Sequence, residues 1–167
     1  TEVAEPDYYR VMLEDDKILA EMTASTRVGM HQYTFPSSDN AHIILDLMHG
    51  IYDYADKNVW TFARVENDHT VVGYRQTNGW ARTRTVYFAM EFSKPFTSYG
   101  FKNFAKEDYK GFWRKFGQTR DFPEMAGKQV RAHFDFKTST NEKVKIKFAL
   151  SPVSTAGAMK NLSREIP

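Results

Sequence analysis

Apolar and polar residues alternate along much of this chain, and two segments near its C-terminal end show the pattern most clearly. Their apolar positions are Val130, Ala132, Phe134 and Phe136 in the first segment and Val144, Ile146, Phe148 and Leu150 in the second. A period of two places the apolar side chains of a strand on one face and leaves the other face to water. Five polar residues, 138–142, separate the segments and are typical of a hairpin loop. The pattern predicts an antiparallel hairpin over residues 129–150.

The same period recurs, less regularly, in the first half of the chain. Two pairs of segments are each joined by a short polar turn and are predicted to form hairpins, namely residues 8–13 with 17–22 and residues 58–65 with 70–76. Two further strands are predicted at residues 27–35 and 82–92. Short antiparallel strands at this spacing predict an all-β fold, an antiparallel β-sandwich.

Three segments depart from this alternation. Residues 41–47 are almost continuously apolar, which is typical of a strand buried on both faces. Residues 99–117 combine aromatic residues with lysines and are interrupted by Gly100 and Gly111, which indicates an irregular helix or a long loop over the sheet edge. Near the C-terminal end a helix is expected to begin, with Ser154 or Thr155 as its N-cap.

The composition fits one ordinary globular domain and excludes few functions. The chain has 167 residues, 41% of them hydrophobic, and its formal net charge is +2. This near balance gives no electrostatic reason to expect nucleic acid or an anionic membrane as a partner. No apolar run approaches the roughly 20 residues that a membrane-spanning helix needs. Cysteine is absent, so disulfide bonds and thiolate chemistry are excluded.

Three aspartates and one histidine gather between positions 46 and 56 and form the first candidate site. Asp46, His49, Asp53 and Asp56 are residue types that bind metals. Their spacing matches neither a zinc signature nor a calcium loop. We therefore favour ordinary turn acids following a buried strand, and assign no metal ligand.

Aromatic residues supply two further candidates. Trp80 follows a turn between two predicted strands, where its flat ring would be a stacking platform for a sugar. We favour the alternative that it folds back over the edge of the sandwich, because no neighbouring residue supports a platform. Residues 99–116 interleave aromatic and basic side chains, as in some nucleic-acid-binding segments. The same aromatic residues fall near helical spacing, which favours a packed face bordered by lysines. We identify no catalytic acid or base, because hydrolysis of a glycoside needs two carboxyl groups on either side of one bond and the sequence cannot pair them.

Short blocks along the whole chain, in a fixed order, carry a family resemblance. They are Ala-Glu-Pro-Asp-Tyr-Tyr-Arg-Val from position 4, Thr-Arg-Val-Gly-Met-His from 26, Tyr-Thr-Phe-Pro from 33, Gly-Trp-Ala from 79, Phe-Ser-Lys-Pro-Phe from 92 and Ala-Met-Lys-Asn-Leu from 158. This series resembles the N-terminal β-sandwich domain of glycoside hydrolase family 92, the exo-acting α-mannosidases. Residues 99–128 contribute least to it.

The resemblance implies a supersandwich-like domain that packs on a C-terminal (α/α)6 domain and helps to form the active-site cleft with it. It implies a secreted, periplasmic or cell-surface enzyme that depends on calcium, inverts the anomeric centre and acts on mannose-containing glycans. In this frame residues 1–153 are part of the sandwich, and residues 154–167 begin the connection toward the helical catalytic domain. The resemblance implies that the catalytic carboxylates and most of the calcium contacts belong to the helical domain. No catalytic residue of the family maps onto this chain, so the chain alone is expected to be inactive.

Two other functions compete with this interpretation. A free-standing carbohydrate-binding module would use Trp80 as its platform, and a nucleic-acid-binding module would use residues 99–116. We expect the chain to end as a helix begins, which favours a piece of an enzyme over an autonomous module. The small net charge weighs against nucleic acid.

Overall fold

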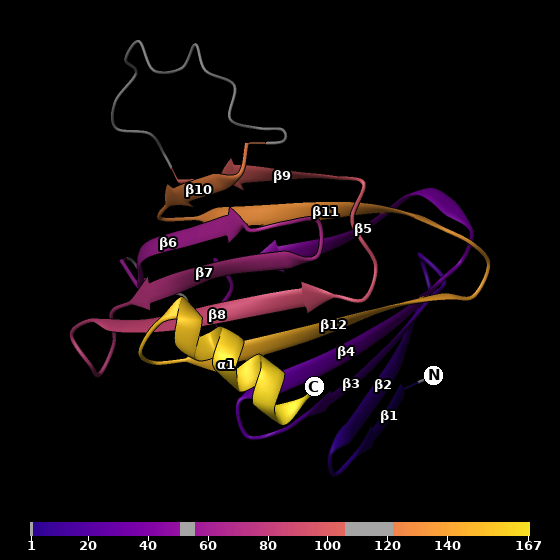
Figure 1. The fold of residues 1–167 in the computed structure, drawn as a ribbon, viewed down its shortest axis with the longest axis horizontal. Coiled ribbons are helices and arrows are strands. Elements are labelled where there is room, and N and C mark those ends of the chain that lie inside the picture. The colour runs from indigo at the N-terminus through magenta and orange to yellow at the C-terminus, as the bar shows by residue number, and fades with distance from the viewer. Residues whose placement is uncertain (1, 51–55, 106–121) are drawn as a thin grey trace.

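The computed structural model describes residues 2–50, 56–105 and 122–167. Within these residues the chain is mostly β-structure with a helix at its C-terminal end (Figure 1). In chain order the elements are β1 (Glu2–Glu5), β2 (Tyr8–Leu13), β3 (Ile18–Ala24), β4 (Val28–Phe35), β5 (Ser38–Asp46), β6 (Asn58–Val65), β7 (Thr70–Thr77), β8 (Arg84–Phe92), β9 (Ser98–Asn103), β10 (Glu124–Gly127), β11 (Val130–Thr138), β12 (Glu142–Ser151) and α1 (Thr155–Glu165).

The strands form two antiparallel sheets of unequal size. The larger sheet has nine strands in the order β1-β2-β3-β4-β12-β8-β7-β6-β10, and the smaller has three in the order β5-β11-β9. Their apolar faces pack together, so the predicted all-β sandwich is confirmed. The hairpins β2–β3 and β6–β7 are confirmed as well. The short strands β1 and β10 were not predicted.

The predicted hairpin over residues 129–150 is wrong in its pairing, although both strands exist. β11 belongs to the smaller sheet and β12 to the larger one, so the short connection between them crosses from one layer to the other (Figure 1). β12 pairs instead with β4 and β8 in the middle of the larger sheet. Alternation shows which side of a strand is buried, and it is the same whether two strands lie side by side or face each other.

The prediction for residues 41–47 is also wrong. Ala41, Ile43 and Leu45 point inward and are buried, whereas the exposed fraction of Ile44 on the opposite face is 58%. The smaller sheet is a layer whose inner side alone is covered by the described residues, so β5 is buried on one face rather than two. The segment predicted as a helix or loop from residue 99 begins instead within strand β9, and its residues 106–117 lie outside the described part of the chain.

Phenylalanine rings from both layers meet in the core. The ring of Phe92, on β8, has its centroid 5.1 Å from that of Phe134 and 5.6 Å from that of Phe136, both on β11. Phe96 adds an edge-on contact to Phe92 at 5.7 Å. Such tilted arrangements suit the charge distribution of aromatic rings and add to the burial of their area.

Buried Thr61 also joins the two sheets. Its hydroxyl donates to the carbonyl of Gly127 at 2.6 Å and accepts the N–H of Val130 at 3.3 Å. β6 and β10 belong to the larger sheet and β11 to the smaller, so this one side chain satisfies two backbone groups from different layers.

Helix α1 covers the outer face of the larger sheet. Ser154 is its N-cap, as predicted, and its hydroxyl accepts the N–H of Gly157 at 3.0 Å. Ala158 and Leu162 pack into a second buried cluster that includes Val28, Val72, Ala89 and Ala149. The central strands are therefore covered on both faces. Among the described residues no helix has the length and apolar character to cross a membrane.

Gly73 has no side chain and so leaves room for the ring of Phe88 in the core. A Cβ at this position would lie 2.1 Å from the carbonyl oxygen of Phe62 and 2.7 Å from Cζ of Phe88. Gly73→Ala is expected to lower the free energy of unfolding by about 1–3 kcal/mol through overpacking. The control is Gly29→Ala, whose Cβ would meet its nearest atom at 3.6 Å, and which is expected to be neutral or stabilising. Urea unfolding of both variants tests this, and equal midpoints for the two would contradict it.

Glu165 holds the C-terminal end of α1 to the segment before β4, and this contact makes the stability of the domain depend on pH. Its carboxylate accepts hydrogen bonds from the hydroxyl of Ser25 at 2.6 Å, from Nε of Arg27 at 2.6 Å and from the backbone N–H of Arg27 at 3.0 Å. These bonds, the one from Ser25 first, lower the pKa of Glu165 from 4.5 to about 2. A carboxyl whose pKa is depressed by folding stabilises the protein above its unfolded pKa and loses this effect as the pH falls.

Wild-type protein should therefore lose this contribution as the pH falls from about 4.5 to about 2. Glu165→Gln is expected to lower stability near neutral pH and to flatten that part of the stability curve, measured by thermal unfolding at a series of pH values. The control is Glu14→Gln, which alters an exposed ion pair with Lys17 at 3.5 Å and should leave the curve unchanged. An equally steep curve in Glu165→Gln would contradict the assignment.

Candidate functional site

Trp80 lies in the loop that joins β7 to β8, at the left of Figure 1. The N–H of Asn78 donates to the carbonyl of Lys57 at 2.8 Å, and that of Gly79 donates to the carbonyl of Ala81 at 3.1 Å. Trp80 is fully exposed, at 109% of the reference area for tryptophan. The alternative in which this ring folds back over the edge of the sandwich is therefore wrong, and the indole is available to a ligand or to another protein surface.

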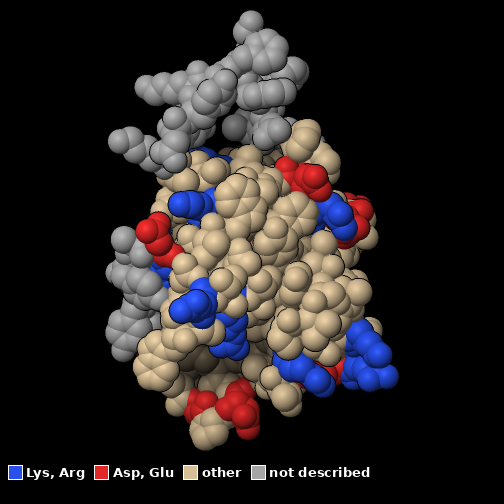
Figure 2. Space-filling view, turned by 90° about the vertical axis from the view of Figure 1, so that its left-hand side faces the viewer, with Lys and Arg blue, Asp and Glu red and all other residues tan. Residues whose placement is uncertain are grey.

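A row of aromatic residues crosses the outer face of the larger sheet near this loop. Phe62, Tyr74 and Tyr87 are neighbours across β6, β7 and β8, with ring centroids 5.5 and 5.8 Å apart. Trp60 lies two residues before Phe62 on the same face and is 41% exposed. Phe62 and Tyr74 stack on each other, so they offer less open ring surface than Trp60 or Trp80. Figure 2, which views the molecule from this end, shows a broad uncharged area with charged side chains at its margins.

Asp46 is tied into the protein by its own neighbours. Its Oδ1 accepts the N–H groups of Met48 and His49 at 2.7 and 3.1 Å, and its Oδ2 accepts Nε–H of Arg131 at 2.9 Å. Partial burial alone would raise the pKa of Asp46, but these hydrogen bonds and the guanidinium together lower it. This is the behaviour of a turn acid with a structural ion pair, the interpretation that the sequence favoured.

The other members of that sequence cluster do not join Asp46 around a common point. Asp56 lies 3.9 Å from Nζ of Lys128, the carbonyl of His49 accepts a hydrogen bond from Arg75, and Asp53 lies outside the described residues. Within the part of the chain that the structure describes, no three His, Asp or Glu side chains are close enough together to hold a metal ion.

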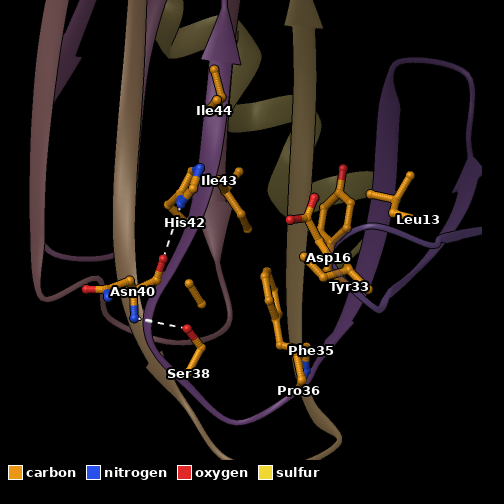
Figure 3. A pocket seen from close by; sticks show the side chains of 12 residues that line it. Leu13, Asp16, Tyr33, Phe35, Pro36, Ser38, Asn40, His42, Ile43 and Ile44 are labelled. Carbon is orange, nitrogen blue, oxygen red and sulfur yellow. Dashed lines mark hydrogen bonds between the residues drawn. The ribbon is translucent and has the colours of Figure 1, made fainter.

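A groove of about 360 Å³ lies between β5 and the inner face of the larger sheet (Figure 3). Ile43 on β5 and Tyr33 and Phe35 on β4 line its two sides, while Pro36 and Ser38 close one end. Asp16 is the only carboxylate among the residues that line it. The groove is thus largely apolar and lacks the pair of carboxyl groups that glycoside hydrolysis requires.

The aromatic and basic segment from residue 99 is described only at its beginning. Lys102 Nζ lies 4.8 Å and Arg131 Cζ 5.1 Å from the ring centroid of Phe104. These cations therefore already stack on an aromatic ring within the chain. The positions of the candidate segment from 106 to 116 lie outside the described residues, so its role stays a prediction.

A family model decides the relationship of this chain to known proteins. The model of the glycosyl hydrolase family 92 N-terminal domain matches residues 1–151. The chain belongs to glycosyl hydrolase family 92. The resemblance that the sequence blocks carry is confirmed. The comparison with curated proteins found no match.

Solved structures of family 92 proteins share this fold. The family GH92 α-mannosidase BT3965 from Bacteroides thetaiotaomicron is 38% identical, with a TM-score of 0.82 over 97% of this chain. The inverting mannosidase BT2199 from the same organism is 24% identical, with a TM-score of 0.77 over 99% of this chain, a likeness of fold. The chain spans only 21% and 20% of the length of these two proteins. It therefore corresponds to about one fifth of each of these two proteins.

The calcium ion that the resemblance to family 92 implies finds no cluster of three His, Asp or Glu side chains among the described residues. Asp46 is the strongest acidic candidate, but both of its carboxylate oxygens already accept hydrogen bonds, from two backbone N–H groups and from Arg131. These residues do not fit a calcium site, so we derive no chemical step through the ion here.

Sequence reasoning missed the aromatic row and the groove. Phe62, Tyr74 and Tyr87 occupy positions on the face that alternation assigns to water, and this mismatch was the signal that could have revealed the row. The groove could be predicted only by knowing that β5 lies opposite β4, and no local sequence pattern contains that information.

Proposed function

We propose that this chain is the non-catalytic N-terminal sandwich domain of a calcium-dependent, inverting α-mannosidase that hydrolyses mannose-containing glycans. The observation that carries the proposal is the 38% identity, over nearly the whole chain, with one part of a family GH92 α-mannosidase. The domain packs on an (α/α)6 domain of the same polypeptide and contributes one wall of the cleft between them.

The side chains of the described residues favour a structural role for this domain over catalysis of glycoside hydrolysis. Inverting hydrolysis needs an acid and a base about 6.5–9.5 Å apart with a water between them. The groove beside β5 contains the single carboxylate of Asp16, and Asp46 is bound to Arg131. The acid, the base and the calcium ion would therefore reside in the remainder of the enzyme. Such an enzyme, acting on glycans outside the cell, would be secreted, periplasmic or displayed at the cell surface.

Comparison of this chain with its full-length parent tests the proposal. The parent is expected to hydrolyse an aryl α-mannoside or an α-linked mannobiose, with the released mannose appearing first as the β-anomer by NMR. A chelator should abolish this activity, and calcium should restore it. The chain alone should release no mannose under the same conditions.

Two results would overturn different parts of the proposal. Hydrolysis by the chain alone would show that it contains a complete active site. A full-length parent that is folded but inert on every mannoside linkage would remove the assigned substrate class.

The exposure of Trp80 favours a second candidate, a carbohydrate-binding module. Titration with α-linked mannobiose, followed by tryptophan fluorescence, separates the two functions. As part of an enzyme, the chain alone should show no saturable change. A saturable change that is lost in Trp80→Ala and kept in Trp60→Ala, the matched exposed control, would establish the binding module instead.

A further inference from the structure

The four edge strands of the two sheets differ in how they are protected from pairing with another strand. β1 and β10 have four residues each and carry Glu2, Glu5 and Glu124. β9 has six residues, carries Lys102 and contacts β10. Short length and charged side chains are devices by which natural proteins keep an edge unpaired.

β5 has none of these devices along its centre. It has nine residues, Ser-Asp-Asn-Ala-His-Ile-Ile-Leu-Asp, with its aspartates at positions 39 and 46 and no Lys, Arg or Pro. Among the described residues its only neighbour in the sheet is β11. A long, regular and apolar edge of this kind is typical of a strand in the interior of a sheet.

The backbone groups that β5 leaves open can be identified from its register. The N–H of Leu47 donates to Val130 on β11, and the register between the two strands is regular from Ala41 to Asp46. Backbone groups alternate in direction along an antiparallel strand. The N–H groups of Ile43 and Leu45 therefore point to β11, and those of His42 and Ile44 point to the free edge.

The larger sheet continues past this edge with its apolar inner face uncovered. Ile18 and Tyr33 are only partly buried against the core. Leu13, which also lines the groove, points to the same inner face as its neighbour Ile18 and is 42% exposed. The groove of about 360 Å³ runs between this face and β5, in the position that the next strand of the smaller sheet would cover (Figure 3).

We propose that a further β-strand of the same polypeptide pairs with the free edge of β5 in the full-length enzyme. Its backbone bonds to His42 and Ile44, and its alternate apolar side chains fill the groove over Tyr33 and Phe35. This inference rests on the proposed function in one respect, that the chain is part of a longer enzyme; the family 92 structure that it matches is about five times its length, since the chain covers 21% of it.

A second copy of this chain fits the same edge poorly. In each copy β2, β3 and β4 extend beyond β5 on the side of the groove. Edge-to-edge pairing of two β5 strands would bring these extensions into the same space. A single added strand meets no such obstacle.

Hydrogen exchange measured on the full-length enzyme tests the inference, with mass spectrometry resolved to single residues across positions 40–47. The amides of His42 and Ile44 are expected to exchange as slowly as those of Ile43 and Leu45, and on the order of 100-fold more slowly than the amides of the exposed turn at Asp15 and Asp16. Rapid exchange at His42 and Ile44 beside slow exchange at Ile43 and Leu45 would show an open edge and overturn the inference. Protection that rises with protein concentration would overturn it in favour of a second copy.

Proline substitution adds a test that does not depend on exchange. Ile44→Pro removes the N–H at the free edge and Ile43→Pro the one facing β11, while Ile44→Val keeps both. In the full-length enzyme both proline variants should lower the melting temperature to a similar extent, and Ile44→Val should leave it nearly unchanged. An Ile44→Pro enzyme that melts with the wild type would contradict the pairing. Neither measurement uses mannosidase activity, so a parent inert on mannosides would leave this inference standing.

Discussion

The contact between the phenylalanines of β8 and β11 governs the arrangement of this domain. Phe92 packs against Phe134 and Phe136 across the interior, with ring centroids 5.1 and 5.6 Å apart. β11 must therefore lie above the larger sheet rather than within it, and the chain has to change layers before β12 begins. The same packing fixes β12 between β4 and β8. The burial of a few large rings thus goes together with the placement of β11 and β12 in different sheets.

Helix α1 completes this arrangement on the opposite side. The outer face of the central strands carries Ala89 and Ala149, whose small side chains let Ala158 and Leu162 approach closely. Farther along the same sheet the outer face carries Phe62 and Tyr74 instead, with no helix over them among the described residues. One sheet therefore presents a closed apolar face beneath the helix and an open aromatic face beside the Trp80 loop. The open part leaves these rings accessible to a ligand or to another protein surface.

The sequence predicts the strands of this domain better than their partners. Period-two alternation located β11 and β12, and polar turns identified the hairpins β2–β3 and β6–β7, because these signals are local. The layer change at residues 139–141 is invisible to such signals, since Phe134 and Val144 alternate in the same way in a hairpin and in facing sheets. Ile44 misled the prediction for β5 because its exposure depends on the coverage of that layer. For the candidate site, the turn role of Asp46 followed from its spacing, whereas the full exposure of Trp80 needed the geometry of its loop.

The central place of β12 has a consequence for the order in which the domain can assemble during synthesis. β4 and β8 are both made before β12, yet each has β12 as its neighbour on one side. Until residues 142–151 leave the ribosome, β4 and β8 lack this shared neighbour, so the strands on its two sides can pair only as two separate groups. The contact of Glu165 with Arg27, 138 residues apart, forms later still. Contacts between such distant segments are associated with slow folding, so the nascent domain spends that interval with two strand edges that need protection from other chains.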